Sequence, residues 1–361
     1  MSDPSLASPP APPGRLTDLR RRYFRTPVQA AISLACLGLL AWLAWGVLNW
    51  AVFSAEFSAD ASPETCRAGA GACWTVIAQR WRIILFGLYP YVEQWRSALA
   101  CVVVVAMIVL SCLPSFWSGL RLAAVWVLGT AAFYILMKGG IFGLRQIGED
   151  QWGGLALTLF IFVATCLIGF PLSIVFALMR RSKLPVISHG IGLVIDAVRS
   201  LPLLSILFAF AVVVPFMLPD FLQGGRLYRV ICGAALFFAA YHAEIIRGGL
   251  QGVARGQEEA AMSLGMSYRH RVGKILLPQA MRNALPATIN QFVISFKETS
   301  LVIVVGFFEI LASGNAAYGT GEWTFAYREV YAFIALIYFT FVFSLSRYGA
   351  YLERRMAVGT R

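Results

Sequence analysis

The feature that most constrains this sequence is a series of apolar segments, each long enough to cross a lipid bilayer. A transmembrane helix needs roughly 20 consecutive, mostly apolar residues. Segments of this kind lie at 29–53, 97–116, 121–137, 155–179, 190–218, 228–249, 284–306 and 331–348. The sequence therefore predicts an all-α integral membrane protein with about eight transmembrane helices.

Composition excludes the main alternatives. Hydrophobic residues make up 59% of the 361 residues and charged residues only 13%, and the mean hydropathy is +0.71. A soluble domain carries roughly 25% charged residues, so a soluble enzyme and a disordered chain are both excluded. The net charge of +12 does not indicate nucleic-acid binding, because the basic residues form short clusters between apolar segments rather than one stripe.

The position of the basic clusters predicts the orientation in the membrane. Lys and Arg concentrate in the tail 1–28, near Arg180, in 247–282 and in 347–361, and they are sparser on the opposite faces. Cytoplasmic loops of membrane proteins carry this excess. With eight crossings, both termini are predicted to be cytoplasmic and the segment 54–96 to be an external loop.

Two cysteines in that external loop are candidates for a disulfide. Cys66 and Cys73 are separated by a Gly/Ala-rich spacer that can turn back on itself. An oxidising compartment would allow them to pair. Two free thiols are the alternative.

One cytoplasmic loop, 250–283, is long and has a helical pattern. It predicts two short helices hinged at Gly265, the second ending before Pro278. A projecting element of this kind can dock in a groove of a partner protein. The alternative is an amphipathic helix lying on the membrane surface.

The spacing within this loop resembles the "EAA" loop of ABC-importer permeases. The matching residues are Glu259, Ala260, Ala261, Gly265, Ile275, Leu277 and Pro278. In that family the loop is a coupling helix that seats in an ATPase subunit. The resemblance implies the same role for these residues.

Further segments resemble the polar amino acid (histidine/glutamine-type) branch of this family. They are DAVRSLPLL from Asp196, AEIIRGG from Ala243, and NQF followed by KETSL between Asn290 and Leu301. The sequence departs from the family pattern at Asp196, Ser200, Leu201 and Glu298, which alters side-chain reach. The resemblance covers about 150–355, and the longer N-terminal part is similar to the M subunit of general L-amino-acid permeases.

This resemblance implies a domain organisation and a set of partners. The expected parts are a tail 1–28, a transmembrane extension 29–150, and an ABC type I importer permease core 151–355. The chain would be a non-catalytic subunit of the bacterial inner membrane that forms the pathway for L-amino acids with a second permease, as a heterodimer. Two ATPase subunits would bind ATP and Mg²⁺, a periplasmic amino-acid-binding protein would deliver substrate, and membrane lipid would surround the spans. The chain contains no G-x-x-x-x-G-K-[ST] motif for ATP phosphates, so no cofactor is expected in it.

Charged residues inside or at the ends of spans are the remaining candidates. Asp196 with Arg199, and Glu244 with Arg247, are spaced i,i+3 and are predicted to form structural ion pairs. An unpaired charge in a span costs about 2.5–3.5 kcal/mol on insertion scales.

One face of the span 284–306 carries three polar side chains. Gln291, Ser295 and Glu298 fall at i, i+4 and i+7. An amino-acid substrate would satisfy them, but a neighbouring helix or a water-filled cavity would do so too.

Other signals are weaker. His189, His242 and His270 lack metal-ligand spacing, so core or interface roles are expected and no metal site. The Gly-rich segment 309–331 is interpreted as an external gate or docking surface. Three alternatives stay open: a permease for glutamate, glutamine and aspartate only, a membrane-embedded lipid-acting enzyme, and an ion-coupled secondary transporter.

Overall fold

The computed structural model describes residues 23–319 and 321–357. Most of the predicted cytoplasmic tail, including its basic cluster at 20–22, lies outside the described residues. The described chain forms two compact units, the first ending at Thr75 and the second beginning at Val76. The helix Gln94–Cys112 of the predicted extension packs against the helix Gly154–Arg180 of the predicted permease core, and the domain boundaries at 28 and 150 stay predictions.

The first unit is one long helix followed by a disulfide-closed loop. Helix α2 (Pro27–Leu48) continues through a π-helical turn to Phe53, and Thr26 caps its N-terminus. Its side chains are apolar and largely exposed all round, as expected for a span that faces lipid or another subunit. After it, helix α3 (Pro63–Ala68) carries Cys66, which forms a disulfide with Cys73. The predicted disulfide is thus present.

The second unit contains the remaining helices. The longer ones are α4 (Thr75–Phe86), which begins at the boundary, α5 (Gln94–Cys112), α6 (Gly119–Lys138), α7 (Gly154–Arg180), α8 (Pro185–Ser200), α12 (Arg226–Gln251), α15 (Leu277–Glu298), α16 (Ile310–Gly319) and α17 (Tyr327–Ala357). The shorter ones are α9 (Leu203–Phe208), α10 (Val214–Met217), α11 (Asp220–Gln223), α13 (Arg255–Ser263) and α14 (Tyr268–His270). A two-residue strand, β1 (Phe308–Glu309), pairs with Gly153 and Gly154.

Helix α12 is the centre of this unit. It packs most extensively against α7 and next against α15. Gly169 of α7 lies against Ala235 and Phe238 of α12, and Gly249 of α12 lies against Ala280 and Ala284 of α15. Small residues of this kind allow the close approach that membrane helices use.

The predicted span 190–218 is not a single helix. It is divided into α8 and the segment Leu203–Met217, which meet at an angle of 106°. The break lies at Leu201, whose backbone is extended (ψ 142°), because a residue before proline, here Pro202, is disfavoured in the α conformation. In the described chain, seven helices are long and apolar enough to cross a membrane, or eight if this bent pair is one span.

The loop 250–283 also differs from expectation. The predicted helix end before Pro278 is wrong, because the helix starting at Tyr268 continues to Glu298 and beyond. A π-helical segment, Arg271–Leu276, precedes Pro278. Widened turns of this kind accommodate a residue that has no N–H to donate. Burial of Leu276 and Ala280 against neighbouring helices holds the continuous helix.

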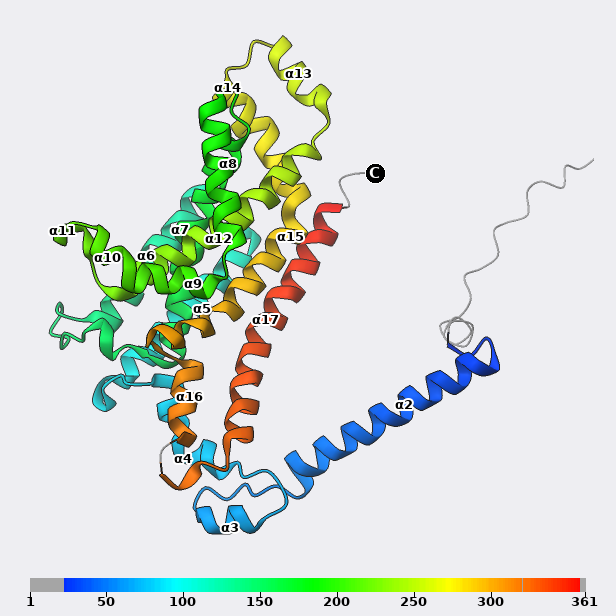
Figure 1. Cartoon of the computed structure of the whole chain (residues 1–361), viewed down its shortest axis with the longest axis vertical. Helices are drawn as coiled ribbons and strands as arrows, with labels where there is room; N and C mark the ends of the chain where they lie inside the picture. Colours follow the sequence, from blue (N-terminus) through cyan, green and yellow to red (C-terminus); the bar gives the residue numbers. More distant parts are fainter. Residues whose placement is uncertain (1–22, 320, 358–361) are drawn as a thin grey trace, which may run out of the picture. The chain divides into compact units, whose positions relative to one another are not determined.

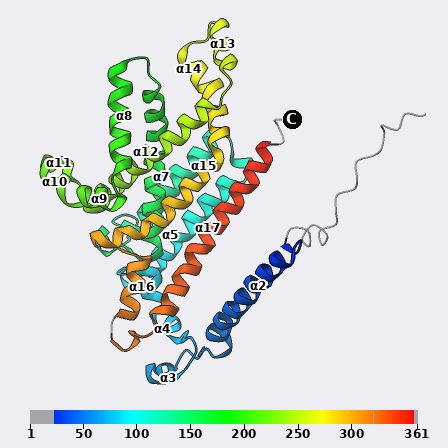
Figure 2. The same ribbon diagram turned by 45° about the vertical axis from the view of Figure 1, so that its right-hand side comes forward.

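The two ends of the second unit carry different elements. Helices α13 and α14 project at one end, near the N-terminus of α8 (Figure 1). The C-terminal end of α17 points the same way (Figure 1). Helix α16 lies at the opposite end, and the turned view shows the same arrangement (Figure 2). The segment 309–331, interpreted from the sequence as an external gate or docking surface, contains helix α16 and the first residues of α17.

Candidate functional site

The first candidate site is the projecting helix α13. It ends in a Schellman motif: the N–H of Gly265 donates to the carbonyl of Met262 (2.9 Å), and the N–H of Met266 to that of Ala261 (3.1 Å). Gly265 has a φ of +68°, a conformation that costs L-residues with a Cβ free energy. Gly265, predicted from the sequence to be a hinge, is thus the residue that ends helix α13.

The residues of the coupling motif divide into a buried and an exposed set. Ala261 is buried and attaches α13 to the body, whereas Glu259, Ala260, Gly265 and Pro278 are exposed and Ile275 and Leu277 are partly buried. Sequence reasoning missed three exposed apolar side chains beside them: Met262 (49% exposed), Leu264 (81%) and Tyr268 (56%). Met262 and Leu264 lie outside the helices that are long and apolar enough to cross a membrane, and exposed apolar side chains in such a place are typical of interaction surfaces.

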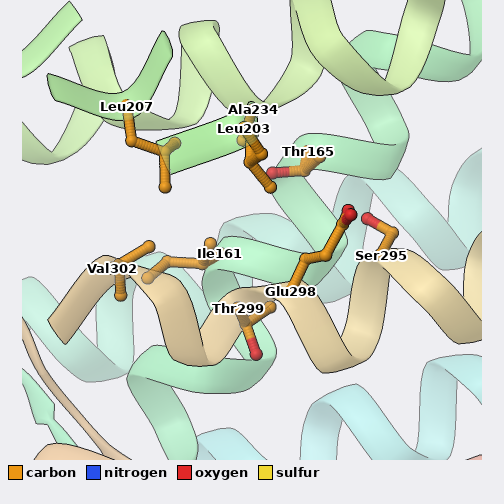
Figure 3. A pocket seen from close by; sticks show the side chains of 9 residues that line it. All are labelled: Ile161, Thr165, Leu203, Leu207, Ala234, Ser295, Glu298, Thr299 and Val302. Carbon is orange, nitrogen blue, oxygen red and sulfur yellow. The ribbon is translucent and has the colours of Figure 1, made fainter. Parts of the chain in front are cut away.

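The second candidate site is a small cavity among the spans. It is about 20 Å³ in volume and is lined by Ile161, Thr165, Leu203, Leu207, Ala234, Ser295, Glu298, Thr299 and Val302. The Glu298 carboxylate extends toward the hydroxyl group of Ser295, and Thr165 lies on another wall of the cavity (Figure 3). Within the described chain the Thr165 hydroxyl is buried and has no hydrogen-bond partner. A cavity of this size holds about one water molecule.

The predicted polar face of α15 only partly faces this cavity. Ser295 and Glu298 line it, but Gln291 is buried (5% exposed) outside it. Thr165 and Thr299 were not predicted. Thr165 lies in an apolar stretch of α7 and gives no local signal, so only the packing of α7 against α15 identifies it.

The four charged residues predicted to form two ion pairs belong to one network, in which only one of the predicted pairs is present. Glu244 is paired with Arg247 at 2.7 Å, as expected. Asp196, however, is paired with Arg180 at 3.1 Å rather than with Arg199, which instead lies 3.9 Å from Glu244. Arg180 at the end of α7 reaches both α8 and α12, so the i,i+3 interpretation of Asp196 and Arg199 is wrong.

The buried histidine has a structural environment. His242 is fully buried and lies 2.8 Å from the Ser173 hydroxyl and 3.0 Å from the Thr288 hydroxyl. These contacts join α7, α12 and α15. Among the described residues, no three His, Cys, Asp or Glu side chains gather as a metal site would require.

Comparisons with known proteins identify the family of the chain. Residues 169–358 match the family described as binding-protein-dependent transport system inner membrane component. The chain is 35% identical to the inner membrane amino-acid ABC transporter permease protein YhdY of Escherichia coli, over 98% of each chain. It is 31% identical to the glutamate/glutamine/aspartate/asparagine transport system permease protein BztC of Rhodobacter capsulatus, over 97% of this chain and 96% of that protein.

A solved structure, described as an amino acid ABC transporter with histidines, is also similar. It is 32% identical and covers 56% of this chain and 92% of its own, with a TM-score of 0.49. The family match and the near full-length relatives together decide the classification. The chain belongs to the family of binding-protein-dependent transport system inner membrane components, the permease subunits of ABC importers.

Proposed function

We propose that this permease subunit serves an ATP-driven importer of L-amino acids. The observation that carries the proposal is the near full-length similarity to two relatives whose names state amino-acid transport. The relatives are transport permeases, so the lipid-acting enzyme considered from the sequence gains no support.

Helix α13 is the proposed docking element for the ATPase subunit. Its exposed surface combines Glu259 and Ala260 with the apolar side chains of Met262 and Leu264. Burying these side chains in a groove of the partner would stabilise the complex by removing apolar area from water. ATP and Mg²⁺ would be bound by that partner.

The cavity at Glu298 is the proposed contact point for substrate. Its carboxylate and hydroxyl groups suit the ammonium group of an amino acid. Among the described residues no Lys or Arg lines the cavity; in the proposed heterodimer, the second permease subunit would meet the substrate carboxylate. Because the present volume holds about one water molecule, substrate entry requires the lining helices to separate.

The orientation of the chain in the membrane follows from the proposal that α13 docks on the ATPase subunit. The end of the second unit that carries α13 would face the cytoplasm, together with both termini. The loop with Cys66 and Cys73 would then face the periplasm, where disulfides persist. A periplasmic binding protein would approach the end that carries α16.

The test is uptake of a panel of labelled L-amino acids by cells that lack this chain, with and without a restored copy. Loss of basic, acidic and neutral amino acids, rescued by the copy, is the expected result. Loss restricted to glutamate, glutamine and aspartate would favour the narrower permease that the name of BztC suggests. Unchanged uptake of every amino acid, with other importers removed, would contradict the substrate class.

A further inference from the structure

Two adjacent arginines at the end of α7 contact three different helices. Arg180 lies 3.1 Å from Asp196 of α8 and 3.1 Å from Glu244 of α12. Its neighbour Arg181 forms an ion pair with Glu258 of α13. The C-terminus of α7 is therefore linked by charge both to the membrane helices and to the projecting helix.

Glu258 makes a second link. Its carboxylate also lies 3.3 Å from the Nε of Arg271, in the π-helical segment that continues into α15. The Glu258 side chain is 26% exposed and that of Arg271 16% exposed, so this pair is partly shielded from water. Glu258 thus joins α13 to α7 and to the helix that ends at Glu298.

The elements joined in this way are the ones that line the cavity. Helix α7 contributes Ile161 and Thr165, α12 contributes Ala234, and α15 contributes Ser295 and Glu298. Helix α8 leads through the 106° bend into α9, whose leucines form the facing wall. A displacement of α13 that moved α7 would therefore reach every wall of the cavity.

The other attachments of α13 to the rest of the unit are uncharged. The helix is flanked by the turn at Gly265, and Ala261 is its one buried side chain. A neutral hydrogen bond from Gln279 of α15 to Gln257 (3.2 Å) also links the helix, whereas Glu258 is ionically paired with two different elements. Exposed ion pairs contribute only about 0–1 kcal/mol each to stability, so we expect these residues to position α13 rather than to hold the fold.

We propose that Arg181 and Glu258, with Arg180 and Arg271, form a junction that transmits movement of α13 to the cavity. This inference rests on the proposed function, since it assumes that an ATPase moves α13. Arg181 and Glu258 are positioning residues and contact no substrate. In a junction of this kind each of the two residues acts through the other, so that removing one has the same effect as removing both.

The experiment is a double-mutant cycle in the reconstituted transporter, with Arg181→Gln, Glu258→Gln and both together. We expect each single variant to keep its melting temperature and its bound ATPase, but to lose about tenfold in solute transported per ATP, within the range of ordinary coupling energies. The double variant should be no worse than either single variant. Lys183→Gln, which removes an exposed charge two residues further along, is the matched control and should behave as wild type.

A second readout does not depend on the transported solute. Ala234→Cys, in a background without the five free cysteines, reports access to the cavity through its labelling rate. We expect ATP to change this rate in the background protein and not in the Arg181 or Glu258 variants. If the background protein responds to ATP but transports no amino acid, the proposed substrate is wrong while the junction is still tested.

Three results would overturn the junction. They are wild-type coupling in both single variants, full additivity in the double variant, and loss of the ATPase from the purified complex. The last would mean that the pair serves docking rather than transmission.

Discussion

At the scale of single residues, Glu298 places a carboxylate at a small cavity inside the membrane region. Ionised groups at such depth are costly and mark pathways for polar solutes. Ser295 and the partnerless hydroxyl of Thr165 line the same cavity. The sequence predicts Glu298 and Ser295 from helical spacing, but it could not predict Thr165, because only the folded chain brings α7 to this face.

We expect Glu298→Gln to reduce uptake by about 10- to 100-fold, the value of a hydrogen bond to a charged group. The melting temperature should be unchanged, because the cavity volume is preserved. Initial uptake rates in vesicles measure the effect, and Glu298→Asp should retain part of the activity. Equal uptake by Glu298→Gln and wild type would exclude substrate contact at this carboxylate.

Glu149 predicts a pH dependence at the end of the unit opposite α13. Burial raises the pKa of this carboxyl, but hydrogen bonds from Lys138 and Tyr228 outweigh it and hold the pKa below 4.5. Because the folded-state pKa is lowered, the stabilisation is present above pH 4.5 and is lost as the pH falls through the folded-state value.

The check is thermal melting of wild type and Glu149→Gln between pH 7 and pH 3. Wild type should melt higher at neutral pH, and the difference should shrink in acid. A difference that is constant with pH would show that the contact is not ionic.

At the scale of elements, α12 and α15 depend on one close backbone contact. A Cβ on Gly249 would lie 2.3 Å from the carbonyl oxygen of Ala280, whereas a Cβ on Gly248 would meet nothing within 4 Å. Overpacking a core costs about 1–3 kcal/mol. Gly249→Val should therefore lower the melting temperature well below that of Gly248→Val, which carries the same helix-propensity cost. Equal melting temperatures of the two variants would show that α12 and α15 can move apart at this contact without loss of stability.

The stop of helix α13 leads to a second prediction at this scale. Gly265→Asp should abolish uptake while the protein stays in the membrane, because it adds a charge to the docking surface at a φ of +68° that glycine adopts most easily. Gly265→Asn isolates the effect of the charge, since asparagine tolerates this conformation about as well as aspartate and is neutral. Uptake assays with membrane quantification measure both. Normal uptake by Gly265→Asp would remove the coupling role of this turn.

At the scale of the whole molecule, the orientation is open to direct test. The end of α17 points the same way as α13, so a fluorescent protein fused after Arg361 should fold in the cytoplasm. A phosphatase inserted in the loop between Cys66 and Cys73 should be active in the periplasm. Activity of the phosphatase at Arg361 instead would reverse the assignment.

The sequence by itself determined the class of the protein, seven of its candidate membrane-crossing segments and the spacing of the EAA-like loop. These depend on apolar length and on local spacing, which the bilayer and the helix impose on any chain. The tertiary structure alone decided the continuous helix through Pro278, the pairing of Asp196 with Arg180, and the cavity at Glu298. Each of these depends on which helices lie side by side, and residues distant in sequence meet there through packing that no local pattern encodes.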